Sequence, residues 1–133
     1  MSFFGVCLFS KTSGQILNEG KPVEGANIIR TMIWQNKTFE EKAVTDKNGN
    51  FTFDAKIKNS LSKFIPVEVV VAQKILIEHN GIQYEGWKAN KRDAEENTEL
   101  NGRPINLKCE LTDEVSVKEQ GRNVIKGMCR WDY

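Results

Sequence analysis

The chain offers few side chains that could carry out catalysis. It contains one histidine, His79, which directly precedes the turn dipeptide Asn80-Gly81. A lone histidine beside a turn is far more often a surface residue than a general base or a metal ligand. A nucleophile needs an adjacent base and an orienting group, and no Gly-x-Ser-x-Gly segment occurs in the sequence. The residue types therefore predict a protein that is not an enzyme.

Metal and redox chemistry have little support either. The three cysteines, Cys7, Cys109 and Cys129, show none of the C-x-x-C spacing that zinc sites and redox motifs use. Buried or half-buried free thiols are the favoured interpretation, and a Cys109–Cys129 bridge is the alternative, because both lie in expected strands. Residues 46–50 begin like a calcium loop, but Gly49 falls too early for that pattern and no Glu follows six positions later. We expect no metal ion and no cofactor.

Composition is that of a soluble globular protein. Hydrophobic residues make up 39% and charged residues 28%, and 19 Lys plus Arg offset 18 Asp plus Glu to leave a formal charge of +1. This balance gives no broad field that would attract nucleic acid or an anionic membrane. The apolar residues 1–10 lack the basic region of a signal peptide, and no run reaches the roughly 20 apolar residues of a membrane span. With free thiols, these features favour a cytoplasmic protein.

Short extended runs separated by turn dipeptides predict an all-β protein that forms one domain over residues 1–133. The strongest strand is expected at residues 66–78, because three consecutive valines have a low helix preference and fit a pleated, buried surface. Side chains alternate between the two faces of a strand. Val67, Val69 and Val71 should therefore lie together on one buried face.

Two dipeptides provide the clearest turn signals. Asn48-Gly49 and Asn80-Gly81 can both adopt the positive φ angles that a tight hairpin requires, so each is predicted to form a β-hairpin. Residues 82–87 alternate in polarity after the second turn. The mixed-charge run at 88–100 interrupts the β pattern and is expected to be a loop or a surface helix.

Three separated motifs resemble the transthyretin-like, or carboxypeptidase regulatory-like, β-sandwich domain. They are Gly14-Gln15-Ile16, the turn and strand start at 20–28, and the Asp-x-Asn-Gly-x-Phe turn within 45–53. The resemblance covers residues 13–53 and implies a Greek-key β-sandwich of about seven or more strands, followed here by a C-terminal extension. It implies little about activity, because such a fold serves many roles. Hydrolysis of 5-hydroxyisourate by relatives of this kind relies on several histidines and a Tyr-Arg-Gly-Ser ending, which this chain lacks.

The predicted partner-binding surface is the segment from Tyr84 to Glu99, because loops on such a scaffold select the partner. Trp87 is a candidate anchor at the end of a strand, and the charges of both signs that follow it suit a protein surface. The residues expected to contact the partner are Tyr84, Trp87, Lys88, Lys91, Arg92, Asp93, Glu95 and Glu96. The alternative is that Trp87 belongs to the core and the charged run is solvated surface.

These features together favour a non-enzymatic domain that binds another protein. The whole chain also resembles small bacterial single-domain proteins, some of which are expected beside secreted toxins. The concrete hypothesis is an immunity protein that binds and neutralises a cognate effector toxin, such as one delivered by a type VI secretion apparatus. The alternative is a structural or adhesive accessory module of a cell-surface or secretion assembly. Neither nucleic acid nor a membrane is an expected partner.

Overall fold

The computed structural model describes residues 5–59 and 68–132, and all regular secondary structure in this part of the chain is β-strand. The prediction of an all-β protein is confirmed. In chain order the strands are β1 (Gly5–Phe9), β2 (Thr12–Asn18), β3 (Lys21–Pro22), β4 (Asn27–Trp34), β5 (Lys37–Val44), β6 (Asn50–Phe53), β7 (Lys56–Asn59), β8 (Val71–His79), β9 (Ile82–Lys91), β10 (Ile105–Glu110), β11 (Ser116–Gln120) and β12 (Asn123–Gly127).

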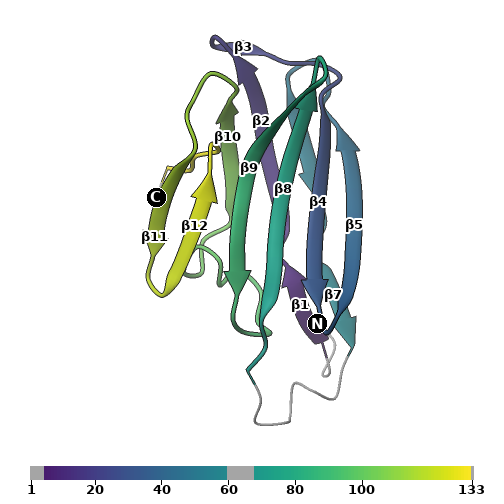
Figure 1. The fold of residues 1–133 in the computed structure, drawn as a ribbon, viewed down its shortest axis with the longest axis vertical. Coiled ribbons are helices and arrows are strands. Elements are labelled where there is room, and N and C mark those ends of the chain that lie inside the picture. Colours follow the sequence, from purple (N-terminus) through teal and green to yellow (C-terminus); the bar gives the residue numbers. More distant parts are fainter. Residues whose placement is uncertain (1–4, 60–67, 133) are drawn as a thin grey trace.

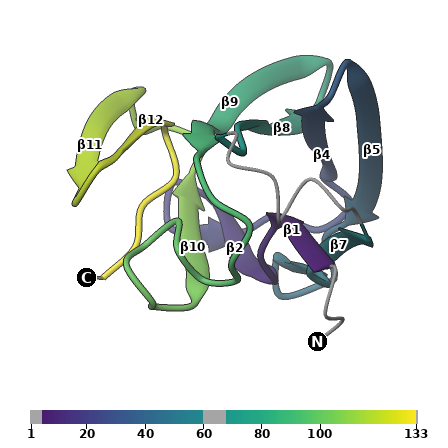
Figure 2. The ribbon, with the colours of Figure 1, turned by 90° about the horizontal axis from the view of Figure 1, so that it is seen from below.

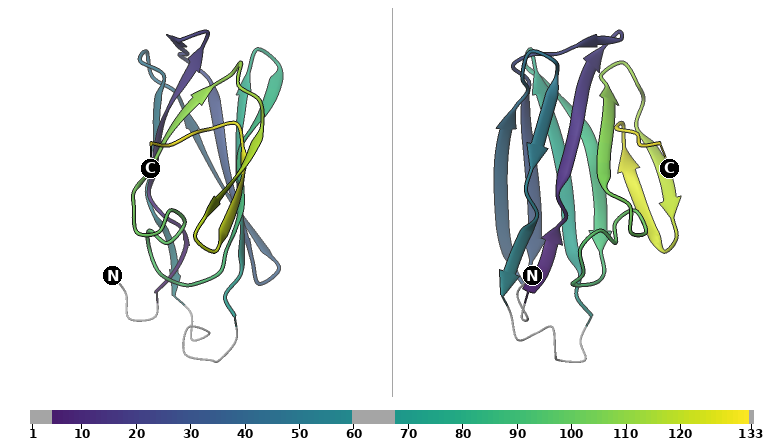
Figure 3. Two further views of the ribbon diagram at one scale, coloured as in Figure 1. Left: turned by 90° about the vertical axis from the view of Figure 1, so that its left-hand side faces the viewer. Right: turned by 180° about the vertical axis from the view of Figure 1, so that it is seen from behind.

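The strands form two layers (Figures 1 and 2). One layer is a six-stranded antiparallel sheet in the order β11-β12-β9-β8-β4-β5, and it lies in front in Figure 1. The second layer contains β10, β2, β3 and β6 in one sheet and the separate pair β1-β7; it faces the viewer in the right-hand view of Figure 3. β2 and β10 run parallel, with Thr12 opposite Ile105. The other pairings of the described strands are antiparallel.

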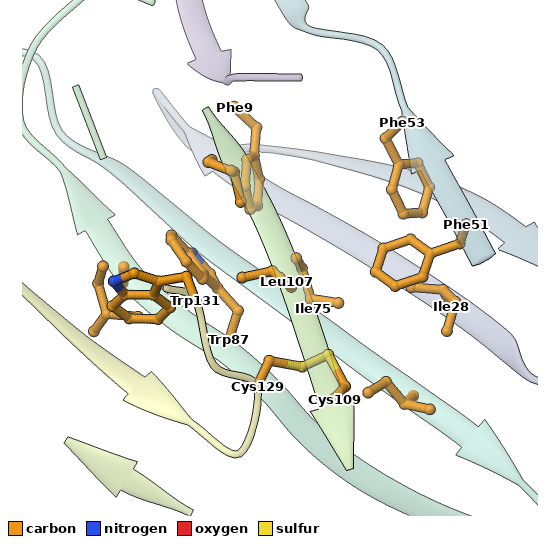
Figure 4. Packing of buried hydrophobic residues seen from close by; sticks show 14 of the residues in the cluster. Phe9, Ile28, Phe51, Phe53, Ile75, Trp87, Leu107, Cys109, Cys129 and Trp131 are labelled. Carbon is orange, nitrogen blue, oxygen red and sulfur yellow. A yellow bond between two sulfur atoms is a disulfide. The ribbon is translucent and has the colours of Figure 1, made fainter. Parts of the chain in front are cut away.

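The core lies between the layers because each strand alternates in burial. In β4 every second residue is buried, and β8 shows the same pattern. Trp87 from β9 occupies this core, with its ring centroid 6.1 Å from that of Phe9 and 5.7 Å from that of Trp131 (Figure 4). Burial of each large apolar side chain contributes about 1.5–3 kcal/mol. The shared apolar core therefore holds the two layers together.

One charged residue is part of this core. Arg30 in β4 is fully buried, and its guanidinium lies over the rings of Phe9 and Phe53 at 4.8 and 4.9 Å. Its Nε and Nη2 donate to Glu41 Oε1 at 3.1 and 2.6 Å, and its Nη1 donates to the Ser10 carbonyl at 3.0 Å. A buried charge is tolerated when it is paired and hydrogen-bonded. Arg30 therefore acts as a structural tie between the two layers.

The predicted hairpin at Asn80-Gly81 is confirmed. It joins β8 to β9 with His79 opposite Ile82, and the two turn residues have φ angles of 51° and 76°. Both angles are positive, as a two-residue turn of the primed kind requires. This hairpin fixes the pairing of the two central strands of the large sheet.

The predicted hairpin at Asn48-Gly49 is wrong in its pairing. The turn forms, with Gly49 at a φ of 77° and its amide donating to the Asp46 carbonyl. However, β5 pairs with β4, whereas β6 pairs with β2 in the other layer. The turn therefore carries the chain from one layer to the other. The hairpin partner of β5 is instead reached through Gln35-Asn36, whose φ angles are 51° and 61°.

The valine-rich strand begins later than predicted. β8 starts at Val71, which is buried, while Val69 precedes the strand and is half-buried. Val67 lies outside the described residues, so its place on the same face stays a prediction. From Val71 onward the predicted strand is correct.

A disulfide fastens the C-terminal tail to the second layer. Cys109 in β10 is bonded to Cys129 across a sequence separation of 20 residues (Figure 4). The favoured interpretation as free thiols is wrong for this pair, and the alternative bridge is present. Cys7 is a buried free thiol. The two bonded cysteines become neighbours because the tail pairs with β10 at Lys108 and Arg130.

Candidate partner-binding site

The predicted anchor Trp87 is a core residue in the structure. Its side chain is 0% exposed, and its indole Nε1 donates a hydrogen bond to Gln73 Oε1 at 3.1 Å. Tyr84 points to the same inner side of β9 and is half-buried against the core. The alternative of a core tryptophan is therefore correct, and Trp87 cannot contact a partner without unfolding of the sheet.

Lys91, Asp93 and Glu95 form a local structural unit at the end of β9. The Lys91 ammonium is buried and donates to Asp93 Oδ1 and to the Asp93 carbonyl, both at 2.9 Å, and also to the Glu95 carbonyl. Desolvation opposes ionisation of Asp93, but hydrogen bonds from Lys91 and Thr98 outweigh it and hold the pKa of that carboxyl below its ordinary value. Lys91 and Asp93 thus stabilise the turn that follows β9.

The other acidic and basic candidates do not gather at one point. Arg92 is exposed and its Nη1 pairs with Glu68 Oε1 at 3.2 Å. Glu95 is exposed and Glu96 is half-buried on the loop that follows. Exposed pairs of this kind contribute about 0–1 kcal/mol. The segment 84–99 is therefore not a continuous docking surface, although Arg92 and Glu95 remain accessible.

A buried carboxylate that the sequence analysis missed connects this loop to the core. Glu99 accepts hydrogen bonds from the Ser10 amide at 2.9 Å, the Ser10 hydroxyl at 2.7 Å and Gln73 Nε2 at 3.1 Å. Gln73 in turn receives the Trp87 indole N–H. Buried polar groups that are fully hydrogen-bonded rigidify the structure around them. The charged run therefore belongs to the scaffold through Glu99.

Lys88 is the predicted residue that leads to a more extended site. It points outward from β9, and it lies directly opposite Lys74 on β8 and Lys126 on β12. Residues paired across adjacent strands share one face of a sheet, so three exposed lysines form a line across three neighbouring strands. We call Lys74, Lys88 and Lys126 the lysine row.

The lysine row is unfavourable for the isolated sheet. Like charges directly opposite one another on a sheet are destabilising, whereas opposite charges contribute about 0.2–1 kcal/mol. Among the described residues, no carboxylate lies within ion-pair distance of any of the three ammonium groups. The row ends at Val117 on β11 and at Thr31 on β4. No ion pair within the described fold therefore offsets its charges.

An apolar hollow of about 370 Å³ adjoins the row on the same face. Ile33 and Val124, which help to line it, are 48% and 55% exposed. Its lining residues come from β4, β8, β9 and β12. The remaining residues around it are Thr31, Ala72, Gln73, Ala89, Asn90 and the three lysines of the row. Cationic and apolar side chains thus occupy one continuous surface.

A second hollow, of about 510 Å³, lies on the outside of the other layer. Several of its charged groups already serve the fold. Arg130 pairs with Asp113 at 3.1 Å, and the Glu110 carboxylate accepts from the amides of Gly20 and Glu19 at 2.7 and 3.0 Å. The hydrogen bond from the Gly20 amide is the main reason that the pKa of Glu110 falls to about 2. This hollow is therefore the weaker candidate.

The part of the chain that the structure describes has neither a metal cluster nor a membrane-spanning helix. No group of three or more His, Cys, Asp or Glu in this part of the chain is placed to hold a metal ion. No helix in it is long and apolar enough to cross a membrane.

Comparison with known proteins identifies a family. The profile of a family described as "Domain of unknown function (DUF6795)" matches residues 12–114, and the chain belongs to that family. The matched region runs from β2 to the connection after β10, so it includes Lys74 and Lys88 and ends before Lys126. No curated protein matches the chain.

Proposed function

We propose that this family member is a non-catalytic domain that binds another protein through the outer face of its six-stranded sheet. The observation that carries the proposal is the uncompensated lysine row beside exposed apolar side chains. Both features cost stability or solubility in the isolated domain. Both become favourable when a partner with carboxylates and apolar groups covers the face.

The outer face is large enough for a specific complex. Six strands spaced about 4.8 Å apart span about 24 Å, and a nine-residue strand such as β8 is about 30 Å long. The resulting area is on the order of 700 Å², close to the roughly 800 Å² that one partner contributes to an interface of standard size. A sheet held by a packed core also presents this surface in a fixed shape, which lowers the entropic cost of binding.

The concrete form of the proposal is an immunity protein that covers the active site of a cognate effector toxin. A preformed cationic face would suit a toxin whose catalytic cleft carries carboxylates. A structural or adhesive accessory module is the second candidate, favoured by the resemblance of residues 13–53 to domains that are used in this way. A toxin-like reading frame beside the gene would favour immunity, and protection of cells that express that toxin would test it directly.

We also propose that the two layers form a transthyretin-like Greek-key sandwich. Support comes from the facing sheets, with β6-β2-β10 opposite β5-β4-β8-β9, and from the parallel contact between β2 and β10. Parallel neighbours cannot be joined by a tight hairpin, and the long connection between β2 and β10 includes β4, β5, β8 and β9 of the other sheet. The hairpin β11-β12 would then be an addition to this framework. An experimental structure with a different strand order would contradict the proposal.

The binding face is tested by capture from the native host with three immobilised proteins: the wild type, Lys88→Glu and Lys47→Glu. Lys47 is exposed in the turn after β5 and gives the same charge change away from the outer face. Proteins identified by mass spectrometry are then purified, and their affinities for all three baits are measured. We expect one partner to bind the wild type and Lys47→Glu alike and to lose at least tenfold affinity for Lys88→Glu. A purified partner that binds all three equally would refute the outer face as the site.

A further inference from the structure

We propose that the partner meets the lysine row with an acidic α-helix that lies across the strands. This inference rests on the proposed function and specifies the chemistry of the partner at the same face. It follows from the spacing of the three lysines, from the apolar hollow beside them and from the carboxylates that limit the row.

The spacing of the row matches one face of a helix. Neighbouring strands are about 4.8 Å apart, so Lys74, Lys88 and Lys126 cover about 9.6 Å at right angles to the strands. Residues i, i+4 and i+7 of an α-helix lie on one side and cover about 10.5 Å along its axis. Three alternate residues of an extended strand cover about 13 Å. A helix with carboxylates at i, i+4 and i+7 therefore fits the row better than an extended peptide does.

The hollow supplies the second half of the match. The three lysines of the row line one part of it, and Ile33 and Val124 expose apolar surface in the rest. Along a helix, the positions that flank an acidic stripe lie over the neighbouring surface of the sheet. Apolar residues at those positions would fill the hollow while the carboxylates meet the lysines. The expected segment is thus amphipathic, with acidic and apolar residues side by side.

The extent of positive charge argues for a protein and against a polyanion such as nucleic acid. The same face carries carboxylates beyond the row, at Glu40, which lies opposite Thr31 and pairs with Lys42 at 3.7 Å, and at Glu119 opposite Val124. A nucleic acid has phosphates along its whole length, and those beyond the row would meet these carboxylates. The chain as a whole carries a formal charge of only +1. The acidic stripe of a protein partner can be as short as the lysine row, so its carboxylates do not meet those beyond the row.

The test uses two synthetic 18-residue helical peptides of identical composition. One has Glu at i, i+4 and i+7 with Leu at the flanking positions; the other has the same residues permuted so that the Glu side chains are spread around the helix. Binding to the full chain is measured by calorimetry, together with competition by a DNA duplex. The protein variants are Lys88→Glu, the neutral Lys88→Met and the control Lys47→Glu, each checked for folding by circular dichroism.

We expect the striped peptide to bind the wild type and Lys47→Glu at least ten times more tightly than the permuted peptide. Lys88→Met should weaken the striped peptide several-fold, and Lys88→Glu at least tenfold. Equal binding of the two peptides, no binding of either, or displacement by DNA at the same concentration as by the striped peptide would overturn the helix. If the native partner still requires Lys88 in any of those cases, the proposed function stands and only the helical partner is wrong. If the native partner ignores Lys88→Glu, the face itself is wrong.

Discussion

Reversal of the central charge of the lysine row should stabilise the isolated protein while it abolishes binding. Lys88 lies between Lys74 and Lys126, so Lys88→Glu replaces two repulsive cross-strand pairs with two attractive ones. Most substitutions destabilise a protein, so a gain of stability is a distinctive outcome. Lys and Glu are both weak strand formers, and the local strand preference changes little.

The size of the gain can be worked out from the pairing. Two unit charges about 6 Å apart in water interact by about 0.7 kcal/mol, and physiological salt reduces this to about 0.3 kcal/mol. Reversing one partner changes each pair by about 0.6 kcal/mol, and two pairs change by about 1 kcal/mol. Lys74 and Lys126 each have Lys88 as their one lysine neighbour across the strands, since Thr31 and Val117 lie on their other sides. Reversal at either end of the row should therefore yield about half the gain.

The assay is urea unfolding of the wild type, Lys88→Glu, Lys74→Glu and Lys126→Glu, followed by circular dichroism in low salt and in 1 M NaCl. Lys47→Glu provides the control for a change in net charge, because Lys47 lies in a turn away from the row. At 1 M salt the Debye length falls to about 3 Å, and the differences between the row variants should largely vanish. A central variant no more stable than Lys47→Glu, or an effect at Lys88 no larger than at Lys74, would show that repulsion within the row does not limit stability.

Three further outcomes are expected, each followed by urea unfolding. Trp87→Ala should lose about 3–5 kcal/mol, because the side chain is fully buried; a loss below 1 kcal/mol would contradict its place in the core. Reduction of Cys109–Cys129 should lower the free energy of unfolding by about 3 kcal/mol for its 20-residue separation. The stability of Cys129→Ser should not change with reductant. If reductant destabilises this variant as much as the wild type, a different bond is responsible. Since the pKa of Glu110 is lowered from 4.5 to about 2, chiefly by the Gly20 amide, its stabilisation is complete above pH 4.5 and is lost as the pH falls towards 2. Glu110→Gln should flatten that acid limb, and an unchanged limb would contradict this origin.

Short-range sequence patterns were sufficient to predict the β-strands and one of the two expected hairpins. Alternation of apolar and polar residues, with β-branched side chains, is a property of each segment alone, and the all-β prediction needed nothing else. Asn80-Gly81 predicted a hairpin correctly because its two flanking segments were also each other's best partners. The Cys109–Cys129 bridge needed long-range information, since the tail reaches β10 only after folding back over the second layer.

The turn at Asn48-Gly49 shows that a local sequence pattern does not determine which strands pair. Its residues specify a tight change of direction, and that change is present. They do not specify whether the next strand pairs with the previous one or crosses to the facing sheet. β5 already has a hairpin partner in β4 through Gln35-Asn36, a turn without glycine that the sequence analysis did not consider. The edge position of β5 leaves β6 to pair with β2 instead.

The predicted partner-binding segment differs from the lysine row for a related reason. Its charges of both signs, next to Trp87, suggested a contact surface for another protein. In the structure Lys91 and Glu99 are buried in hydrogen-bonded roles, while the lysine row combines residues from three strands. Of the row, only Lys88 belonged to the predicted site. The sequences around Lys74 and Lys126 do not indicate a binding role. The two residues join Lys88 in a row only through the way β8, β9 and β12 are paired.

A single extra residue in β9 determines both the core and the candidate site. Leu76 pairs with Glu85, but Ile75 pairs with Trp87, so Gly86 is an unpaired bulge residue. A Cβ at position 86 would approach the Cys129 sulfur to 3.0 Å, which favours glycine there. Without the bulge, the turn would set Trp87 opposite Lys74 on the outer face and would turn Lys88 inward, since a shift of one residue exchanges the faces of a strand. The bulge thus places the indole in the core and aligns the lysines, whereas the position of Trp87 at a strand end beside a charged run had suggested an anchor.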